Sequence, residues 1–329
     1  TRPTIAALLP ELLLANFSFS GDSGWHTLPQ RFDLLGVAAL ILAAAWGLGR
    51  GALDLLRIRL PVRSAEGVAF AAGLGLSLWS LATLLLGLAG LLSQTLFAML
   101  AAGGLAWGLA TLRTRHPQTD AAAKSAHASA RRIVLWVIAL CVPFVLATLL
   151  GAMLPSTDFD VKEYHLGGPK EYWLAGRITF LPHNVYTSFP FLTEMLSLSG
   201  MVLRGDWFRG ALAGKVVLMA YSLISACGVF ALTRELVACG ATAAKGADGD
   251  TASSRAAWLA VLVLLTTPWV HRISIIAYVE GGLACYLLLT VLALRRAIEA
   301  SSRQAVSAQS GEPPAAGWWL LTGLLAGSA

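Results

Sequence analysis

The sequence predicts an all-α, polytopic integral membrane protein. Of its 329 residues, 57% are hydrophobic and only 13% are charged, whereas a soluble domain carries roughly a quarter charged residues. The apolar residues come in blocks about 20 residues long, which is the length of helix that crosses a hydrocarbon core of about 30 Å. Helices of a water-soluble protein would instead each show a polar face. Composition and block length therefore both favour membrane-spanning helices.

The apolar blocks give the order of the expected spans. These lie at 34–53, 67–91, 94–112, 133–154, 210–233, 256–270 and 273–294, and an incomplete one begins at 317. The run 189–203 is only about 15 residues long and contains Pro190 and Glu194, so it is too short to cross comfortably. We expect this run to form a helix that lies at the membrane interface or dips into it.

Both ends of the chain are expected to be truncations. The chain opens at Thr1 without a methionine and closes at Ala329 within the apolar run that begins at Gly317, which is too short to span. Near the start, the apolar piece 4–15 is interrupted by a proline and a glutamate. We interpret it as the remnant of an earlier span or as an interfacial segment.

Basic residues set the expected orientation. If 189–203 does not cross, the four loops that hold most Lys and Arg side chains fall on one side, which should be cytoplasmic. A crossing helix would split these loops between two faces, so we disfavour it. The net charge of +6 then reflects cytoplasmic loops, and no basic face interleaved with aromatic residues indicates nucleic acid. The loop residues are Arg50, Arg57, Arg59 and Arg63, then Arg113, Arg115, Lys124, Arg131 and Arg132, then Arg234, Lys245 and Arg255, and finally Arg295, Arg296 and Arg303.

The densest group of ionisable residues lies in the loop 155–188, outside the cytoplasm in this topology. A solvated loop with an aromatic belt at the interface would have a similar composition. Two features favour a functional site: Asp158 and Asp160 directly follow a span, and an acid is expected inside another span at a matching depth. The loop's ionisable residues are Asp158, Asp160, Lys162, Glu163, His165, Lys170, Glu171, Arg177 and His183, and the rings beside them are Tyr164, Tyr172, Trp173 and Tyr186.

The acid expected inside a span is Glu280. It stands about seven residues beyond Ile273, where the last complete span is expected to start, so it should lie about 10 Å below the outer surface. An ionisable residue within a span is costly and usually functional. Gly281 and Gly282 would let another backbone approach closely. The alternative is a protonated glutamate that forms a hydrogen bond with a neighbouring helix.

Carboxylates from Asp158, Asp160 and Glu280 in one cavity could do three kinds of chemistry. One could act as general base towards a hydroxyl. Two could hold a divalent cation through oxygen ligands. One could stabilise the positive charge that develops on a sugar ring during transfer. Cations that could neutralise a leaving phosphate are Lys170, Arg177, Arg204, Arg209, Lys215 and Arg272.

The order of these residues resembles a known family. Asp160 stands four residues before Tyr164, followed by Gly176-Arg177-Ile178 and then Phe189-Pro190-Phe191-Leu192. This order resembles the first luminal loop of the GT-C glycosyltransferases. It is closest to the bacterial branch related to protein O-mannosyltransferases and the lipid A aminoarabinose transferase (families 39 and 83). The likeness covers about 133–329 and continues through Arg255–Ala260, Thr266-Thr267-Pro268, Ser274–Tyr286 with Glu280, and Trp319–Gly327.

The resemblance implies a division of the chain and an activity. Residues 1–132 would form N-terminal membrane helices with basic cytoplasmic loops, and 133–329 a GT-C-like catalytic membrane core, incomplete at its C-terminus, with 155–188 as its outer loop. The protein would move a sugar from a polyprenyl-phosphate donor to a hydroxyl acceptor on a lipid, glycan or protein. The reaction would take place at the periplasmic face of a bacterial inner membrane. A multi-pass transporter and a non-catalytic membrane subunit are the alternatives.

The same resemblance implies roles for individual residues. Asp160 is the first candidate for the base, Asp158 is the second, and Glu280 would orient the loop or share a divalent cation with them. A cation such as Lys170 or Arg177 would meet the donor phosphate. The substrate-binding residues implied are Tyr164, His165, Lys170, Arg177 and Arg272.

Overall fold

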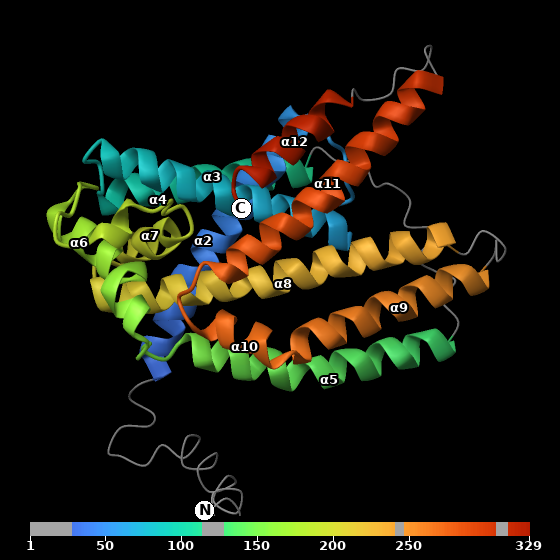
Figure 1. The fold of residues 1–329 in the computed structure, drawn as a ribbon, viewed down its shortest axis with the longest axis horizontal. Coiled ribbons are helices and arrows are strands. Elements are labelled where there is room, and N and C mark those ends of the chain that lie inside the picture. The colour runs from blue at the N-terminus through green and yellow to red at the C-terminus, as the bar shows by residue number, and fades with distance from the viewer. Residues whose placement is uncertain (1–27, 114–127, 241–246, 307–314) are drawn as a thin grey trace, which may run out of the picture.

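The computed structural model describes residues 28–113, 128–240, 247–306 and 315–329, and these form helices joined by turns, without a strand (Figure 1). The apolar piece predicted at 4–15 and most of the second basic loop lie outside the described residues. The long helices are α2 (Leu28–Leu55), α3 (Ala65–Leu88), α4 (Gln94–Arg113), α5 (Ala128–Ala152), α8 (Trp207–Gly240), α9 (Ala247–Thr266) and α11 (Glu280–Val306). The short ones are α6 (Gly167–Ala175), α7 (Glu194–Arg204), α10 (Pro268–Ile275) and α12 (Ala316–Ala326), with a π turn η3 (Val161–His165) and a 3-10 turn η4 (Val185–Ser188).

Six of the described helices are long and apolar enough to cross a membrane, namely α2, α3, α4, α5, α8 and α11. The helices α9 and α10 meet at an angle of 59° and would add a seventh crossing if they form one broken span. The prediction of an all-α, polytopic membrane protein is confirmed in this form.

The two spans predicted at 256–270 and 273–294 are divided differently in the structure. The helix α9 ends at Thr266 because Pro268 has no backbone N–H and its ring would clash with the preceding turn. Pro268 instead starts α10, which ends at Ile275, and α11 begins only at Glu280. Four apolar or aromatic residues, 276–279, therefore form a turn rather than the interior of a span.

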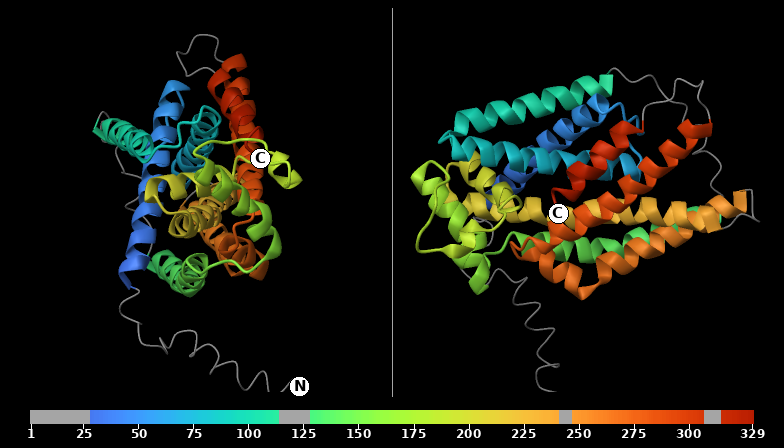
Figure 2. Two further views of the ribbon diagram at one scale, coloured as in Figure 1. Left: turned by 90° about the vertical axis from the view of Figure 1, so that its left-hand side faces the viewer. Right: turned by 45° about the horizontal axis from the view of Figure 1, so that its top comes forward.

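The helix ends that flank the four basic loops lie at one end of the bundle, which we call the basic end (Figures 1 and 2). There Nε of Arg296 in α11 lies 2.7 Å from Oε1 of Glu66 in α3. At the opposite, outer-loop end, Nε2 of Gln94 donates a hydrogen bond to the carbonyl oxygen of Leu203 at 2.8 Å. The prediction that the four loops share one side is confirmed for the helix ends that flank them.

The helix α7 does not cross the bundle, as predicted, but its surroundings differ from the prediction. All residues from Glu194 to Leu203 are buried, so the helix packs inside the protein and not on a bilayer surface. It contacts α8 closely because a Cβ added at Gly210 would lie 2.3 Å from Cα of Met201, and one at Gly214 would lie 2.5 Å from Cα of Ser197. Such small residues let two helix backbones approach.

Glycine seams also join the first three described helices. A Cβ added at Gly49 of α2 would lie 1.9 Å from the carbonyl oxygen of Ala71 in α3, and one added at Gly47 would lie 2.0 Å from that of Gly104 in α4. Lipid tails are as apolar as leucine, so close packing of this kind, more than transfer from water, holds membrane helices together.

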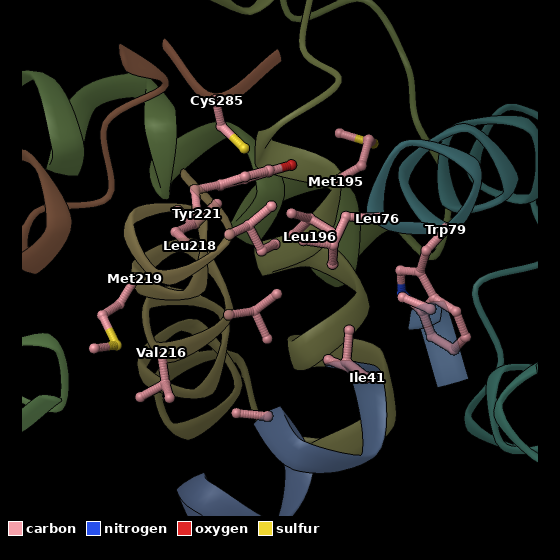
Figure 3. Packing of buried hydrophobic residues seen from close by; sticks show 14 of the residues in the cluster. Ile41, Leu76, Trp79, Met195, Leu196, Val216, Leu218, Met219, Tyr221 and Cys285 are labelled. Atoms are coloured by element: carbon pink, nitrogen blue, oxygen red, sulfur yellow. The ribbon is translucent and has the colours of Figure 1, made fainter. Parts of the chain in front are cut away.

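The buried core surrounds α8 and crosses the predicted boundary between 132 and 133 (Figure 3). Ile41 of α2, Trp79 of α3, Leu196 of α7 and Tyr221 of α8 belong to one cluster of buried apolar residues. The left view of Figure 2 shows α8 in the middle of the bundle. The N-terminal helices and the core behind them therefore pack as one body, and this body presents the loop 155–188 at a single end.

Candidate functional site at the outer-loop end

The two aspartates that follow α5 have different surroundings. Asp158 is half-buried, and its Oδ1 accepts a hydrogen bond from Nη2 of Arg272 in α10 at 2.9 Å. Asp160 is exposed at the start of η3 and has no hydrogen bond or ion pair with any described residue. Of the two, only Asp160 therefore has both carboxylate oxygens free of described hydrogen-bond partners.

Glu280 is exposed at the first position of α11, so the prediction that it is buried about seven residues inside a span is wrong. The reason is the turn 276–279, whose apolar residues extend the hydropathy of α10 although the helix has ended. At a helix N-terminus its negative charge is favoured by the helix dipole.

The rings of Tyr278 and Tyr164 lie among the predicted carboxylates. Burial is the main cause that raises the pKa of Tyr278, and the charges of Asp158, Asp160 and Glu280 raise it further. Burial likewise leads the causes that raise the pKa of Tyr164, with contributions from Asp160 and Glu280. The structure thus brings together the three carboxylates that the sequence singled out.

An aromatic surface accompanies these carboxylates. The ring of Tyr164 lies 4.1 Å from that of His165 and 5.1 Å from that of Tyr186, and the His165 ring lies 5.4 Å from that of Tyr278. Such a surface offers apolar ring faces and polar hydroxyl groups side by side. It suits a ligand with both kinds of surface, such as a sugar.

Glu194 is a residue of this end that the sequence reasoning did not assign to the site. Its Oε1 lies 2.8 Å from Nδ1 of His165, and the two residues are only 3% and 6% exposed. Its Oε2 is buried and has no hydrogen-bond partner among the described residues. The available signal was an acid within the short apolar run 189–203, where Glu194 served only to argue against a crossing helix.

A groove lies at the same end of the bundle, between the start of α2, the end of α5 and the start of α8. Its volume is about 340 Å³, and its walls hold two arginines, Arg31 and Arg209, among apolar residues of which Phe208 is the largest. Nη1 of Arg31 donates to the carbonyl oxygen of Met153 at 2.8 Å. The guanidinium of Arg209 makes no hydrogen bond or ion pair with described residues, which leaves all its donors available.

Lys215 lies close to the groove, because the carbonyl group that it binds stands between the lining residues Met153 and Pro155. It lies in α8, is only 1% exposed, and donates a hydrogen bond to the carbonyl oxygen of Leu154. The charge of Asp158 acts on it. Pro155, on the wall of the groove, stands three residues before Asp158, so the groove lies at the base of the outer loop that carries the two aspartates.

Lys170 and Arg177, expected to meet a donor phosphate, lie elsewhere at this end. Nζ of Lys170 is 4.2 Å from the ring centre of Trp207, at the start of α8. Arg177 is exposed beside Gly90 in the turn between α3 and α4. Of the predicted substrate-binding cations, only Arg272 contacts the carboxylates directly.

The structure does not group the three carboxylates as ligands of one divalent cation. In the part of the chain that the structure describes, no three His, Cys, Asp or Glu side chains are grouped closely enough to hold a metal ion. Asp158, Asp160 and Glu280 therefore do not form a three-ligand metal site.

Comparison of the chain with protein-family models, with curated proteins and with solved structures finds no match. The groove, the carboxylates and the aromatic rings are therefore the features that bear on its function.

Proposed function

We propose that this protein is a membrane glycosyltransferase with a GT-C-like core. It would transfer a sugar from a polyprenyl-phosphate donor to a hydroxyl acceptor at the outer-loop end. The observation that carries the proposal is that one end of the bundle holds both three carboxylates around the Tyr278 ring and an apolar groove with two arginines. A lipid-linked phosphate has one long apolar part and one anionic group, and the groove has surfaces for both. The periplasmic face of a bacterial inner membrane is the location that this proposal implies.

In the proposed sugar transfer, Asp160 acts as the base and two arginines stabilise the leaving phosphate. The carboxylate of Asp160 takes the proton of the acceptor hydroxyl, and the hydroxyl oxygen forms a bond to the anomeric carbon. The bond between that carbon and the phosphate oxygen breaks, and the phosphate leaves with the electron pair, still attached to its lipid. Arg209 and Arg31 are the cations that would stabilise this phosphate.

The other groups hold the reacting parts in place. Arg272 fixes the carboxylate of Asp158, and with Glu280 this carboxylate would stabilise positive charge on the sugar ring. The rings of Tyr164, Tyr186 and Tyr278 would pack against the sugar.

The bent pair α9–α10 is the observation that favours the second candidate, a transporter. Transporters often form their sites from broken membrane helices, and these two helices meet at 59°. The glycosyltransferase is preferred because the carboxylates cluster at one end of the bundle, whereas transporter sites lie near the midplane.

The experiment that tests the proposal gives the purified protein a polyprenyl phosphate carrying a radiolabelled sugar, from a panel of sugars, together with extracted envelope lipid as acceptor. We expect label to appear in the acceptor, and Arg209→Gln to reduce its appearance. Lys162→Gln is the matched control, because Lys162 is exposed in the same outer loop and its side chain makes no hydrogen bond or ion pair with described residues. Uptake of free sugar into proteoliposomes, without any transfer from the lipid donor, would overturn the proposal in favour of a transporter.

A further inference from the structure

A second charged region lies at the basic end, far along the helices from the carboxylates. It is an open cavity of about 500 Å³ between the ends of α3, α8, α9 and α11. Its walls contain three arginines, Arg63, Arg234 and Arg296, and two glutamates, Glu66 and Glu235. The lining therefore carries one more positive charge than negative.

The two glutamates are already bound by arginines of α11. Arg296 forms two hydrogen bonds with Glu66, at 2.7 Å and 2.9 Å. Arg295 binds Glu235, with Nη2 and Oε1 2.9 Å apart. Arg63 is exposed and makes no hydrogen bond or ion pair with residues that the structure describes. Each glutamate thus already binds an arginine, while the guanidinium of Arg63, which lines the same cavity, can receive an anion.

The start of α3 adds positive potential to the same cavity. Ser64 and Ala65 line it, and Oγ of Ser64 accepts the hydrogen bond of the Gly67 N–H at 3.0 Å. That N–H is therefore already used, so an anion would meet the remaining backbone N–H groups of the first turn, at the positive end of the helix dipole.

Apolar residues complete the wall formed by α8. Phe230, Ala231 and Ala238 line the cavity together with the charged groups. The Phe230 ring packs on Trp258 of α9, with ring centres 5.1 Å apart. A wall with apolar and basic parts at the end of membrane helices is suited to a lipid headgroup and the glycerol region beneath it.

We propose that this cavity binds a phosphate group, and that its source is the headgroup of an anionic phospholipid in the leaflet at the basic end. The ion pairs of α11 alone would serve as a clamp between α3, α8 and α11. A clamp requires neither the cavity nor Arg63, which takes no part in these ion pairs. The proposal is independent of any activity at the outer-loop end.

The test measures lipid retention by native mass spectrometry of the purified protein. Phosphatidylglycerol and phosphatidylcholine compete for binding to the protein, and inorganic phosphate is added in a separate series. We expect the parent to prefer phosphatidylglycerol, because choline adds a positive charge that the arginines repel. Arg63→Gln should weaken phosphatidylglycerol binding by about fivefold, as expected for one basic residue near a membrane surface. Arg63→Lys keeps the charge and should restore most of the binding.

Arg113→Gln is the matched control, since Arg113 is exposed at the basic end on α4 but does not line the cavity. Equal retention of the two lipids by the parent, or an equal loss in Arg113→Gln, would refute a specific site. Displacement of phosphatidylglycerol by millimolar inorganic phosphate would identify the phosphate group alone as the ligand and overturn the lipid as its source. Retention of phosphatidylglycerol in the presence of inorganic phosphate supports the phospholipid headgroup as the ligand.

Discussion

Nδ1 of His165 lies 2.8 Å from Oε1 of Glu194, and the pair joins the outer loop to the buried helix α7. Removal of one member leaves the other buried without its partner. We therefore expect Glu194→Ala to lower the free energy of unfolding by about 1–3 kcal/mol, the cost of a buried polar group that has lost its hydrogen-bond partner. Glu194→Gln should lower it less, because the amide oxygen can still accept a hydrogen bond from an Nδ1–H group.

Unfolding in detergent, followed by circular dichroism, measures this effect. Glu163→Ala is the control, since the Glu163 side chain is exposed two residues before His165. An unfolding free energy of Glu194→Ala equal to that of the control would show that the pair does not stabilise the fold.

The glycine seams predict a contrast within a single helix. Gly49→Ala would place its Cβ 1.9 Å from the carbonyl oxygen of Ala71, so α2 and α3 must separate. Overpacking of this kind lowers the free energy of unfolding by about 1–3 kcal/mol. Gly36→Ala lies in the same helix, with nothing within 4 Å of its Cβ, and should leave stability unchanged or slightly raised. Thermal unfolding of the two variants side by side tests the seam, and equal midpoints would contradict it.

The arrangement of the two ends predicts opposite labelling from the two sides of a membrane. Ser188→Cys at the outer-loop end and Ser302→Cys at the end of α11 place thiols at exposed positions. The background carries Cys239→Ser, because Cys239 is the exposed member of the four cysteines. In intact cells an impermeant maleimide should label Ser188→Cys, while Ser302→Cys should react only after permeabilisation. Labelling of both from one side would contradict the topology.

Span positions and the grouping of the basic loops were predictable because both follow from composition along the chain. The depth of Glu280 was not, because the turn 276–279 is as apolar as a span and only the break at Pro268 reveals it. The pairing of His165 with Glu194 was also out of reach. These residues are 29 positions apart, and α7 must first fold back against η3 and α6.

Which basic residues lie near the carboxylates could not be predicted from the sequence either. The sequence offered six cations, Arg209 and Arg272 among them, but the resemblance favoured Lys170 and Arg177 for the phosphate. The structure instead places Arg272 against Asp158 and Arg209 in the groove at the same end of the bundle. Contacts between distant helices, set by packing, decide which basic residue reaches the carboxylates.

Asp160→Asn should be the variant that most reduces sugar transfer. An acceptor hydroxyl is a poor nucleophile at neutral pH and needs a positioned base. Asp160 is exposed, without a hydrogen bond or ion pair to the described residues, and it stands beside the rings that would hold the sugar. The amide has nearly the same volume but cannot take the proton, so the rate should fall by a factor of about 10²–10⁴.

Asp158→Asn is the matched comparison, because the Asp158 carboxylate is already bound by Arg272 and an amide oxygen can still accept that hydrogen bond. The substitution also removes one of the two negative charges proposed to face the sugar ring, so the rate should fall, but by less than in Asp160→Asn, because Glu280 keeps the other charge. The measurement is the initial rate of transfer from the labelled polyprenyl-phosphate donor by each purified variant. If Asp158→Asn is inactive while Asp160→Asn is close to the parent, the base is Asp158, and Arg272 orients it. If both variants match an active parent, the base does not come from this loop.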